Sequence, residues 1–225
     1  SRAGTRSSAR PALTVTVAKL LNRDQGKLMT KSERTSTGYV GLDKVLDGLR
    51  IGDNVVLKVD SIDDYRYFVG PFVDQALANG KNLVYMRFGD HPPLVEPSPH
   101  IRIYELAPKL GFETFASEIH RIITEEGPGT FYVFDCLSDL LSAWATDHMI
   151  GNFFRVTCPY LFELDTVAYF GLIRGNHALR TLERIRETTQ VLFDVFRYQR
   201  DIHVQPLKVW QRNSPTMFLH HRKQG

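Results

Sequence analysis

A short polar segment follows the apolar, β-branched stretch of residues 54–59, and its residue types bear on phosphate chemistry. Its functional side chains are Asp60, Ser61, Asp63, Asp64, Tyr65 and Arg66. A loop that binds phosphate after such a strand needs glycines, whose backbone N–H groups can point at phosphate oxygens, and a lysine and a hydroxyl for the charge and Mg²⁺. Residues 55–67 contain no glycine and no Gly-Lys-Ser/Thr. The segment therefore lacks the chemistry of a phosphate loop.

The three aspartates of this segment also act against an anion. Carboxylates at the entrance of a helix complement the positive end of the helix dipole themselves. At a separation of about 4 Å and an effective dielectric constant of about 20, each contact between like charges costs on the order of 4 kcal/mol. We therefore expect Asp60, Asp63 and Asp64 to reject a triphosphate.

Two further acids follow predicted strands. Asp135 ends the apolar stretch 131–135, and open α/β sheets bind their ligands at this end of their strands. It could hold a metal ion, or it could cap the following helix by accepting hydrogen bonds from the first N–H groups. Asp90 follows the stretch 83–88 and is either a general base or a structural acid of the loop.

The elements that must position these residues follow from the apolar patterns. Glycines bracket a short apolar-periodic stretch within residues 37–52, which predicts one small helix between two turns. Residues 54–59 and 83–88 have the composition of buried strands. Residues 67–78 have helical spacing and stop at Asn79-Gly80, a good C-terminal cap.

The middle of the chain continues this alternation. Residues 101–106 predict a third strand, 112–125 a helix, and 131–135 the fourth and most apolar strand. Strands that alternate with helices and are apolar throughout indicate a parallel sheet covered on both faces.

The C-terminal part predicts two further helices and an antiparallel pair of strands. We expect helices over residues 139–149 and 161–172, with a strand over 155–159 between them. Residues 202–210 and 216–219 are predicted to pair antiparallel and to close the edge of the sheet.

This order of features resembles the RecA-like ATPases of the KaiC type over roughly residues 37–220. The matching residues are the glycines around Gly41-Leu42-Asp43 and the strand ends Phe88-Gly89-Asp90 and Phe134-Asp135-Cys136-Leu137-Ser138-Asp139. The resemblance implies an α/β fold: a RecA-like three-layer sandwich with a mainly parallel central sheet and antiparallel edge strands at the C-terminal side. It also implies that Asp135 positions Mg²⁺ and that Asp90 stands where the family activates the attacking water.

The end of the chain adds to this resemblance. Residues 184–189 followed by 207–215 are similar to the late strand of the family and its "K…RGSP" tail. Lys208 and Arg212 match positions that reach across a subunit boundary toward the γ-phosphate of a neighbour, where such groups cancel transition-state charge. Because no phosphate cradle is present, we expect these two residues to make surface or inter-subunit salt bridges instead.

A second resemblance is more specific in what it implies. Residues 48–56, 59–68, 151–154 and 208–210 look like the degenerate KaiC-like module at the amino end of some phosphoenolpyruvate synthase or pyruvate phosphate dikinase relatives. In those proteins an ATP-grasp domain and a phosphohistidine domain carry the phosphotransfer chemistry. The resemblance implies these domains as partners within an ATP-dependent phosphotransferase. The resemblance assigns no kinase residue to this chain, since none of the eight histidines here has the flanking pattern of a phosphocarrier.

Composition is that of an ordinary globular protein, with 43% hydrophobic and 24% charged residues among 225. Residues 1–36 hold eight basic and two acidic side chains, a charge of +6, so that residues 37–225 sum to −3. We expect residues 1–36 to form a basic, flexible arm and residues 37–225 to form one RecA/KaiC-like domain. The slightly acidic body gives no electrostatic reason to expect nucleic acid as a partner.

The two cysteines and the apolar runs indicate the compartment. Cys136 and Cys158 have no metal-binding spacing, so we expect buried thiols in a reducing compartment. No apolar run approaches the roughly 20 residues of a membrane-spanning helix. The sequence therefore predicts a cytoplasmic protein without a membrane partner.

These features predict a non-hydrolysing regulatory or assembly module that self-associates, needs no cofactor and is not itself catalytic. Two alternatives stay open. In the first, the chain is an ATPase that binds ATP and Mg²⁺ without a standard loop, with Asp135 and Asp90 on the metal and with Lys208 and Arg212 on a neighbour's phosphate. In the second, it is a sensor that binds a cationic or neutral small molecule in the same cleft.

Overall fold

The computed structural model describes residues 33–143 and 146–222. Most of the predicted basic arm, residues 1–32, lies outside the described residues. The last residues of that arm take part in the fold: β1 (Arg34–Thr35) pairs antiparallel with β2 (Leu49–Arg50).

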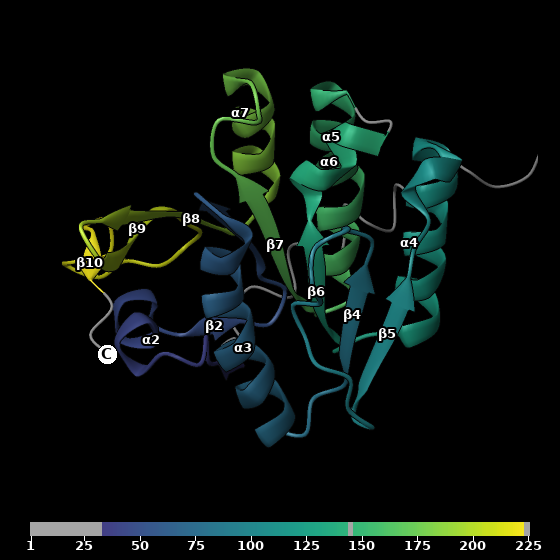
Figure 1. Ribbon diagram of the computed structural model, residues 1–225. Helices are drawn as coiled ribbons and strands as arrows, with labels where there is room; N and C mark the ends of the chain where they lie inside the picture. Colours follow the sequence, from purple (N-terminus) through teal and green to yellow (C-terminus); the bar gives the residue numbers. More distant parts are fainter. Residues whose placement is uncertain (1–32, 144–145, 223–225) are drawn as a thin grey trace, which may run out of the picture. The chain divides into compact units, whose positions relative to one another are not determined.

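A sheet of eight strands forms the centre of the described part of the chain (Figure 1), in the order β10-β9-β8-β3-β7-β6-β4-β5. The strands are β3 (Asn54–Val59), β4 (Leu83–Arg87), β5 (Ile101–Glu105), β6 (Phe131–Cys136), β7 (Val167–Ile173), β8 (Val191–Tyr198), β9 (Asp201–Val209) and β10 (His221–Arg222). All neighbours from β8 to β5 are parallel, whereas β9 is antiparallel to both β8 and β10. The predicted α/β fold, with a mainly parallel sheet and antiparallel edge strands at the C-terminal side, is confirmed.

Helices cover both faces of this sheet. In the described ranges these are α2 (Val40–Leu46), α3 (Ile62–Ala78), α4 (Phe112–Glu126), α5 (Leu140–Ala143), α6 (Asp147–Glu163) and α7 (Leu179–Thr188), with short 3₁₀ helices η1 (Pro108–Leu110) and η2 (Leu137–Asp139). Along β3, Val55 and Leu57 belong to the core shared with α3, while Val56 belongs to the core shared with α4 and α6. Alternate side chains of a strand point to opposite faces, so the apolar run of β3 fills two cores and the protein has three layers.

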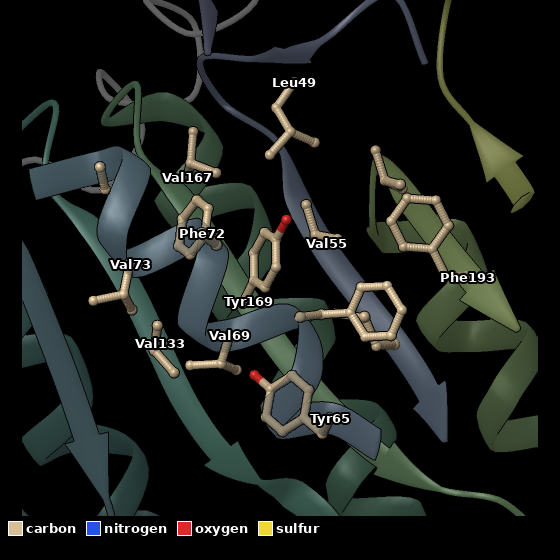
Figure 2. Close-up of a cluster of buried hydrophobic side chains, with 14 of the residues drawn as sticks. Leu49, Val55, Tyr65, Val69, Phe72, Val73, Val133, Val167, Tyr169 and Phe193 are labelled. Atoms are coloured by element: carbon tan, nitrogen blue, oxygen red, sulfur yellow. The ribbon is translucent and has the colours of Figure 1, made fainter. Parts of the chain in front are cut away.

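The core on the α3 face is rich in aromatic rings (Figure 2). Phe72 of α3 stacks on Tyr169 of β7, with the ring centroids 4.0 Å apart. Tyr65 is fully buried in the same cluster and donates a hydrogen bond to the backbone carbonyl of Phe134. A Cβ atom on Gly171 would lie 2.7 Å from the Tyr65 ring, so the strand needs glycine at this point. Tyr65 thus anchors α3 rather than forming part of a loop.

The single helix predicted over residues 139–149 is wrong, since this range contains α5 and, after the N-cap Thr146, the start of α6. Two further predictions for the C-terminal half are also wrong. Residues 155–159, predicted as a strand, lie inside α6, which continues through Pro159. Residues 161–172, predicted as a helix, contain the end of α6 and most of β7. Both errors come from apolar stretches, because a short apolar run fits a buried strand and a buried helix equally well.

Two boundaries also differ from prediction. Helix α3 begins at Ile62, five residues before the predicted start. Residues 216–219 form turns, and the strand that pairs with β9 is His221–Arg222. The predicted strands over 54–59, 83–88, 101–106 and 131–135 are confirmed to within a residue of their ends.

Cys136 and Cys158 are both buried free thiols, as predicted. Among the helices of the described ranges, none combines the length and the apolar character needed to cross a bilayer.

Candidate functional site

The entrance of α3 is filled by ion pairs between its own aspartates and two arginines from later strands. Arg174, just after β7, donates from Nε to Asp60 Oδ1 at 2.5 Å. Arg197 of β8 donates from Nε to Asp64 Oδ1 at 2.7 Å, and its backbone N–H donates to Asp60 Oδ2 at 3.3 Å. Asp64 is buried, whereas Asp60 is partly exposed. The aspartates therefore bind cations that the chain itself supplies.

The local chain geometry explains why the aspartates meet these partners. Ser61 is the N-cap of α3: its side chain accepts from the backbone N–H of Asp64, and its hydroxyl donates to Asp64 Oδ2 at 2.9 Å. The adjacent strands β3, β7 and β8 are parallel, so their carboxyl ends bring residue 60 beside residues 174 and 197. Partial burial acts to raise the pKa of Asp60, but the hydrogen bonds from Arg174 and Arg197 outweigh it, and the pKa lies below its usual value.

The ion pairs extend beyond the loop. Arg174 Nη2 lies 2.6 Å from Asp194 Oδ1, and Lys58 Nζ lies 3.3 Å from the same oxygen. Arg66 lies 3.8 Å from Asp63 and donates to the backbone carbonyls of Pro92 and Pro93. Four carboxylates thus face four cationic groups around the helix entrance: Asp60, Asp63, Asp64 and Asp194 against Lys58, Arg66, Arg174 and Arg197. The charges at the helix entrance therefore balance through internal pairing and do not leave a net negative charge.

Asp135 is completely buried at the end of β6, and hydrogen-bond donors surround its carboxylate. Its Oδ2 accepts from the backbone N–H groups of Phe88 (2.8 Å) and Gly89 (2.7 Å) and from Arg87 Nη1 (3.1 Å). Its Oδ1 accepts from the Tyr85 hydroxyl. Burial and the hydrogen bond to Asp135 raise the pKa of Tyr85 well above its usual value. Asp135 holds the end of β4 and the following turn in place.

These contacts do not fit a magnesium ligand. A carboxylate that binds Mg²⁺ must turn an oxygen lone pair toward the ion, and Mg²⁺ usually keeps several waters. The Asp135 oxygens are buried and already accept four hydrogen bonds, so they do not present a free lone pair to a metal ion. Within residues 33–143 and 146–222, no group of three or more His, Cys, Asp or Glu side chains is arranged to hold a metal ion.

Neither protein-family models nor curated proteins match this chain.

Asp90, the other candidate acid, is exposed in the turn after β4 and is not among the residues bonded to Asp135. The side chain that turns inward is its neighbour His91, whose Nε2 lies 3.6 Å from Asp135 and 3.5 Å from Asp139. Burial raises the pKa of Asp139 above its usual value, and the nearby His91 opposes this shift only in part. The acid beside Asp135 is thus Asp139. This residue belongs to the strand-end motif 134–139, but the sequence did not predict it as a site residue.

Lys208 and Arg212 both have intramolecular partners. Lys208 Nζ donates to the backbone carbonyls of Arg186 and Glu187, at the C-terminal end of α7. Arg212 is buried and binds both carboxylate oxygens of Asp53, at 3.0 and 2.9 Å, and the carbonyl of Gly48 at 2.8 Å. The Arg212 guanidinium therefore joins the C-terminal tail to the start of β3 and does not face outward toward another subunit.

Two cavities of the described part lie away from the α3 entrance. One of about 270 Å³ lies at the other end of α3, beside Leu77, Lys81 and Arg102. The second, of about 410 Å³, lies beside α7 and Lys208. The loop residues 60–66 line neither of them.

The sequence also failed to indicate a hydrogen-bonded row of Ser138, His177 and Asp147 at the carboxyl edge of the sheet. Ser138 was part of a quoted motif, but His177 and Asp147 lie 39 and 9 residues further along the chain. No spacing rule joins them, because the contact depends on how β6, β7 and α6 pack.

Proposed function

We propose that this chain is a RecA/KaiC-like domain that does not hydrolyse nucleotide and acts as a cytoplasmic regulatory or assembly module. One observation carries the proposal: Asp60 and Asp64 bind Arg174 and Arg197 at the helix entrance where a phosphate would lie. A triphosphate would have to break these pairs and leave carboxylates beside its own charges, which is unfavourable in a partly buried site.

The resemblance to the amino-terminal module of phosphoenolpyruvate synthase and pyruvate phosphate dikinase relatives suggests the parent protein. In such a parent, ATP-grasp and phosphohistidine domains would carry the phosphotransfer, and this domain would help to assemble or regulate them. The internal roles of Asp135 and Arg212 support this division of labour, since both hold the fold together through several hydrogen bonds.

Thermal unfolding with and without nucleotide tests the proposal. A ligand that binds only the folded state raises its stability by RT ln(1 + [L]/Kd). We expect no change of melting temperature at millimolar ATP, with or without Mg²⁺. A rise of several degrees that requires Mg²⁺ would contradict the proposal and favour the ATPase alternative; a rise with a neutral or cationic metabolite alone would favour a sensor.

The assembly role has its own test. The chain is mixed with separately expressed ATP-grasp and phosphohistidine domains of a phosphoenolpyruvate synthase, and association is followed by sedimentation velocity. Formation of a mixed complex supports the proposed partners. If all components still sediment independently at about 100 times a dissociation constant of about 1 μM, the proposed partners are excluded.

A further inference from the structure

Ser138, His177 and Asp147 come from three separate parts of the chain and form a continuous hydrogen-bonded row. Ser138 lies in η2 directly after β6, His177 in the connection from β7 to α7, and Asp147 in the first turn of α6. Ser138 Oγ and His177 Nε2 are 2.7 Å apart, and His177 Nδ1 and Asp147 Oδ1 are 2.8 Å apart. The row lies at the carboxyl ends of two adjacent parallel strands, where α/β sheets carry their ligands.

Asp147 determines which nitrogen of His177 carries the proton. Its Oδ2 accepts from the Thr181 hydroxyl at 2.6 Å and from the backbone N–H of Ala178 at 3.0 Å. Partial burial acts to raise the pKa of Asp147, but the hydrogen bonds from Thr181, His177 and Ala178 lower it below its usual value. An ionised carboxylate only accepts, so His177 donates from Nδ1 and its Nε2 is left to accept a proton.

Ser138 donates its hydroxyl proton to His177 Nε2. Its oxygen also accepts from the backbone N–H of Ile173 at 2.8 Å. A hydroxyl has one proton and two lone pairs, so these two bonds leave one lone pair of Oγ for an electrophile. A serine bonded to an imidazole whose other nitrogen is bonded to a carboxylate is the arrangement that activates a serine as a nucleophile.

Access to this serine is narrow. Ser138 is 5% exposed and the side chain of His177 is only 1% exposed, while Gly175, Asn176 and Ala178 next to His177 are exposed. The row therefore lies just beneath the surface and favours a small reagent. Burial raises the pKa of the neighbouring Cys136 thiol to about 12, so this thiol stays protonated and does not compete as a nucleophile.

We propose that Ser138, His177 and Asp147 form an activated-serine site that takes an acyl group from a small activated ester or thioester. The Ser138 Oγ–carbonyl bond forms and the bond from that carbon to the leaving oxygen or sulfur breaks. The proton passes from Oγ to His177 Nε2 and then to the leaving group. Water then attacks the same carbon and gives a proton to His177 Nε2; the bond from the carbon to Ser138 Oγ breaks, Oγ takes this proton from Nε2, and the carboxylic acid leaves. This activity is independent of nucleotide binding and goes beyond the proposed function.

Acetylation by p-nitrophenyl acetate tests the site in the full chain. Release of p-nitrophenol gives the rate, and peptide mass spectrometry locates the acetyl group. We expect the acetyl group on Ser138 and none in Ser138→Ala. Asp147→Asn should slow acetylation at least about 100-fold, because a positioned general base contributes about 10²–10⁴-fold and the amide holds the ring in the wrong tautomer.

Ser142, an exposed serine of α5 whose hydroxyl donates to the Asp139 carbonyl, is the matched control. Ser142→Ala should react as the unaltered chain does, and circular dichroism confirms that each variant is folded. If Ser138 of the unaltered chain carries no more acetyl than Ser142, the row is structural and the proposal is wrong. It is equally wrong if folded Asp147→Asn reacts at the unaltered rate.

Discussion

Asp135 stands where a metal ligand would stand, but its partners give it a different role. The donors that it receives come from Tyr85, Arg87 and two successive backbone N–H groups, all at the end of β4 or directly after it. Its position could be predicted from the sequence, because an acid after an apolar stretch falls at a strand end. Its role could not, since the donors lie 46 to 50 residues away and meet it only in the folded sheet.

Removal of the Asp135 carboxylate should therefore affect folding. Asp135→Ala leaves Arg87 and two backbone N–H groups without their buried acceptor, and breaking a buried pair costs about 3–5 kcal/mol. Denaturant unfolding followed by circular dichroism measures this loss. Asp90→Ala, at the exposed candidate acid, should stay within about 0.5 kcal/mol of the unaltered chain. Equal stability of the two variants would contradict the role assigned to Asp135.

Acid should weaken the fold through Asp147. The pKa of this carboxyl is lower in the folded chain than in the unfolded chain. Its contribution to stability is therefore fully present above the unfolded pKa of about 3.9 and is lost as the pH falls through the lower folded pKa. The free energy of unfolding of the unaltered chain should exceed that of Asp147→Asn at pH 6, and the difference should shrink below about pH 4. A difference that persists at pH 2 would refute this assignment.

At the scale of elements, the start of α3 shows which local signal was overlooked. Ser61 followed three residues later by Asp64 is a capping pattern, and the structure has this cap. The apolar spacing predicts a helix that starts at residue 67, whereas the capping spacing of these polar residues predicts the start at residue 62 that the structure has. Helix α6 continues through Pro159 because the apolar face of the helix, including Phe154, Cys158 and Leu161, is buried in the core. Tertiary packing overrides a local preference of about 3 kcal/mol there.

The helix entrance should regain affinity for anions when its own carboxylates are neutralised. In Asp60→Asn/Asp64→Asn, Arg174 and Arg197 lose the charges of Asp60 and Asp64 beside the N-terminus of a helix of 17 residues, while Arg174 keeps its ion pair with Asp194. We expect pyrophosphate to raise the melting temperature of this double variant by a few degrees and to leave the unaltered chain unchanged, since about 1 kcal/mol moves the midpoint by about 2–4 °C at this chain length.

Asp63→Asn is the control for this experiment, because the Asp63 side chain is 76% exposed and lies 3.8 Å from Arg66. It should not respond to pyrophosphate. Stabilisation of all three proteins to the same extent would show that the anion acts elsewhere.

The contact between β7 and α3 should tolerate no extra atom. In Gly171→Ala the new methyl group would lie 2.7 Å from the Tyr65 ring, and overpacking of a core typically costs about 1–3 kcal/mol. Gly70→Ala, within α3, meets nothing within 4 Å and should instead stabilise the helix by about 0.5–1 kcal/mol. Unfolding midpoints in urea compare the two, and a stable Gly171→Ala variant would mean that Tyr65 is less firmly held than its burial indicates.

At the scale of the whole molecule, the arrangement of the strands could be predicted from the sequence better than the ion pairs at the edge of the sheet. Apolar runs separated by helical stretches require a parallel sheet with two covered faces, and this requirement does not depend on a single residue. The charges at its edge do depend on single residues: Asp60, Asp64, Arg174 and Arg197 neutralise each other only because β3, β7 and β8 end side by side. The layers of the fold therefore do not determine which charges meet at the edge of the sheet.

Self-association, which the sequence predicts, should depend on the exposed apolar residues of the C-terminal tail. Phe218 and Leu219 are 53% and 58% exposed beside the edge strands β9 and β10, and Gln205 of β9 donates to the Phe218 carbonyl. Large exposed apolar groups next to a sheet edge favour contact with another chain.

Phe218→Ser/Leu219→Ser should weaken association at least about tenfold in dissociation constant, which equals about 1.4 kcal/mol, as measured by sedimentation velocity. Leu110→Ser, at a 66% exposed residue of η1, should leave association unchanged. A monomeric unaltered chain at about 100 μM, or equal association of both variants, would exclude the tail as the interface, because an interface that uses these side chains must lose buried apolar area when they become serine.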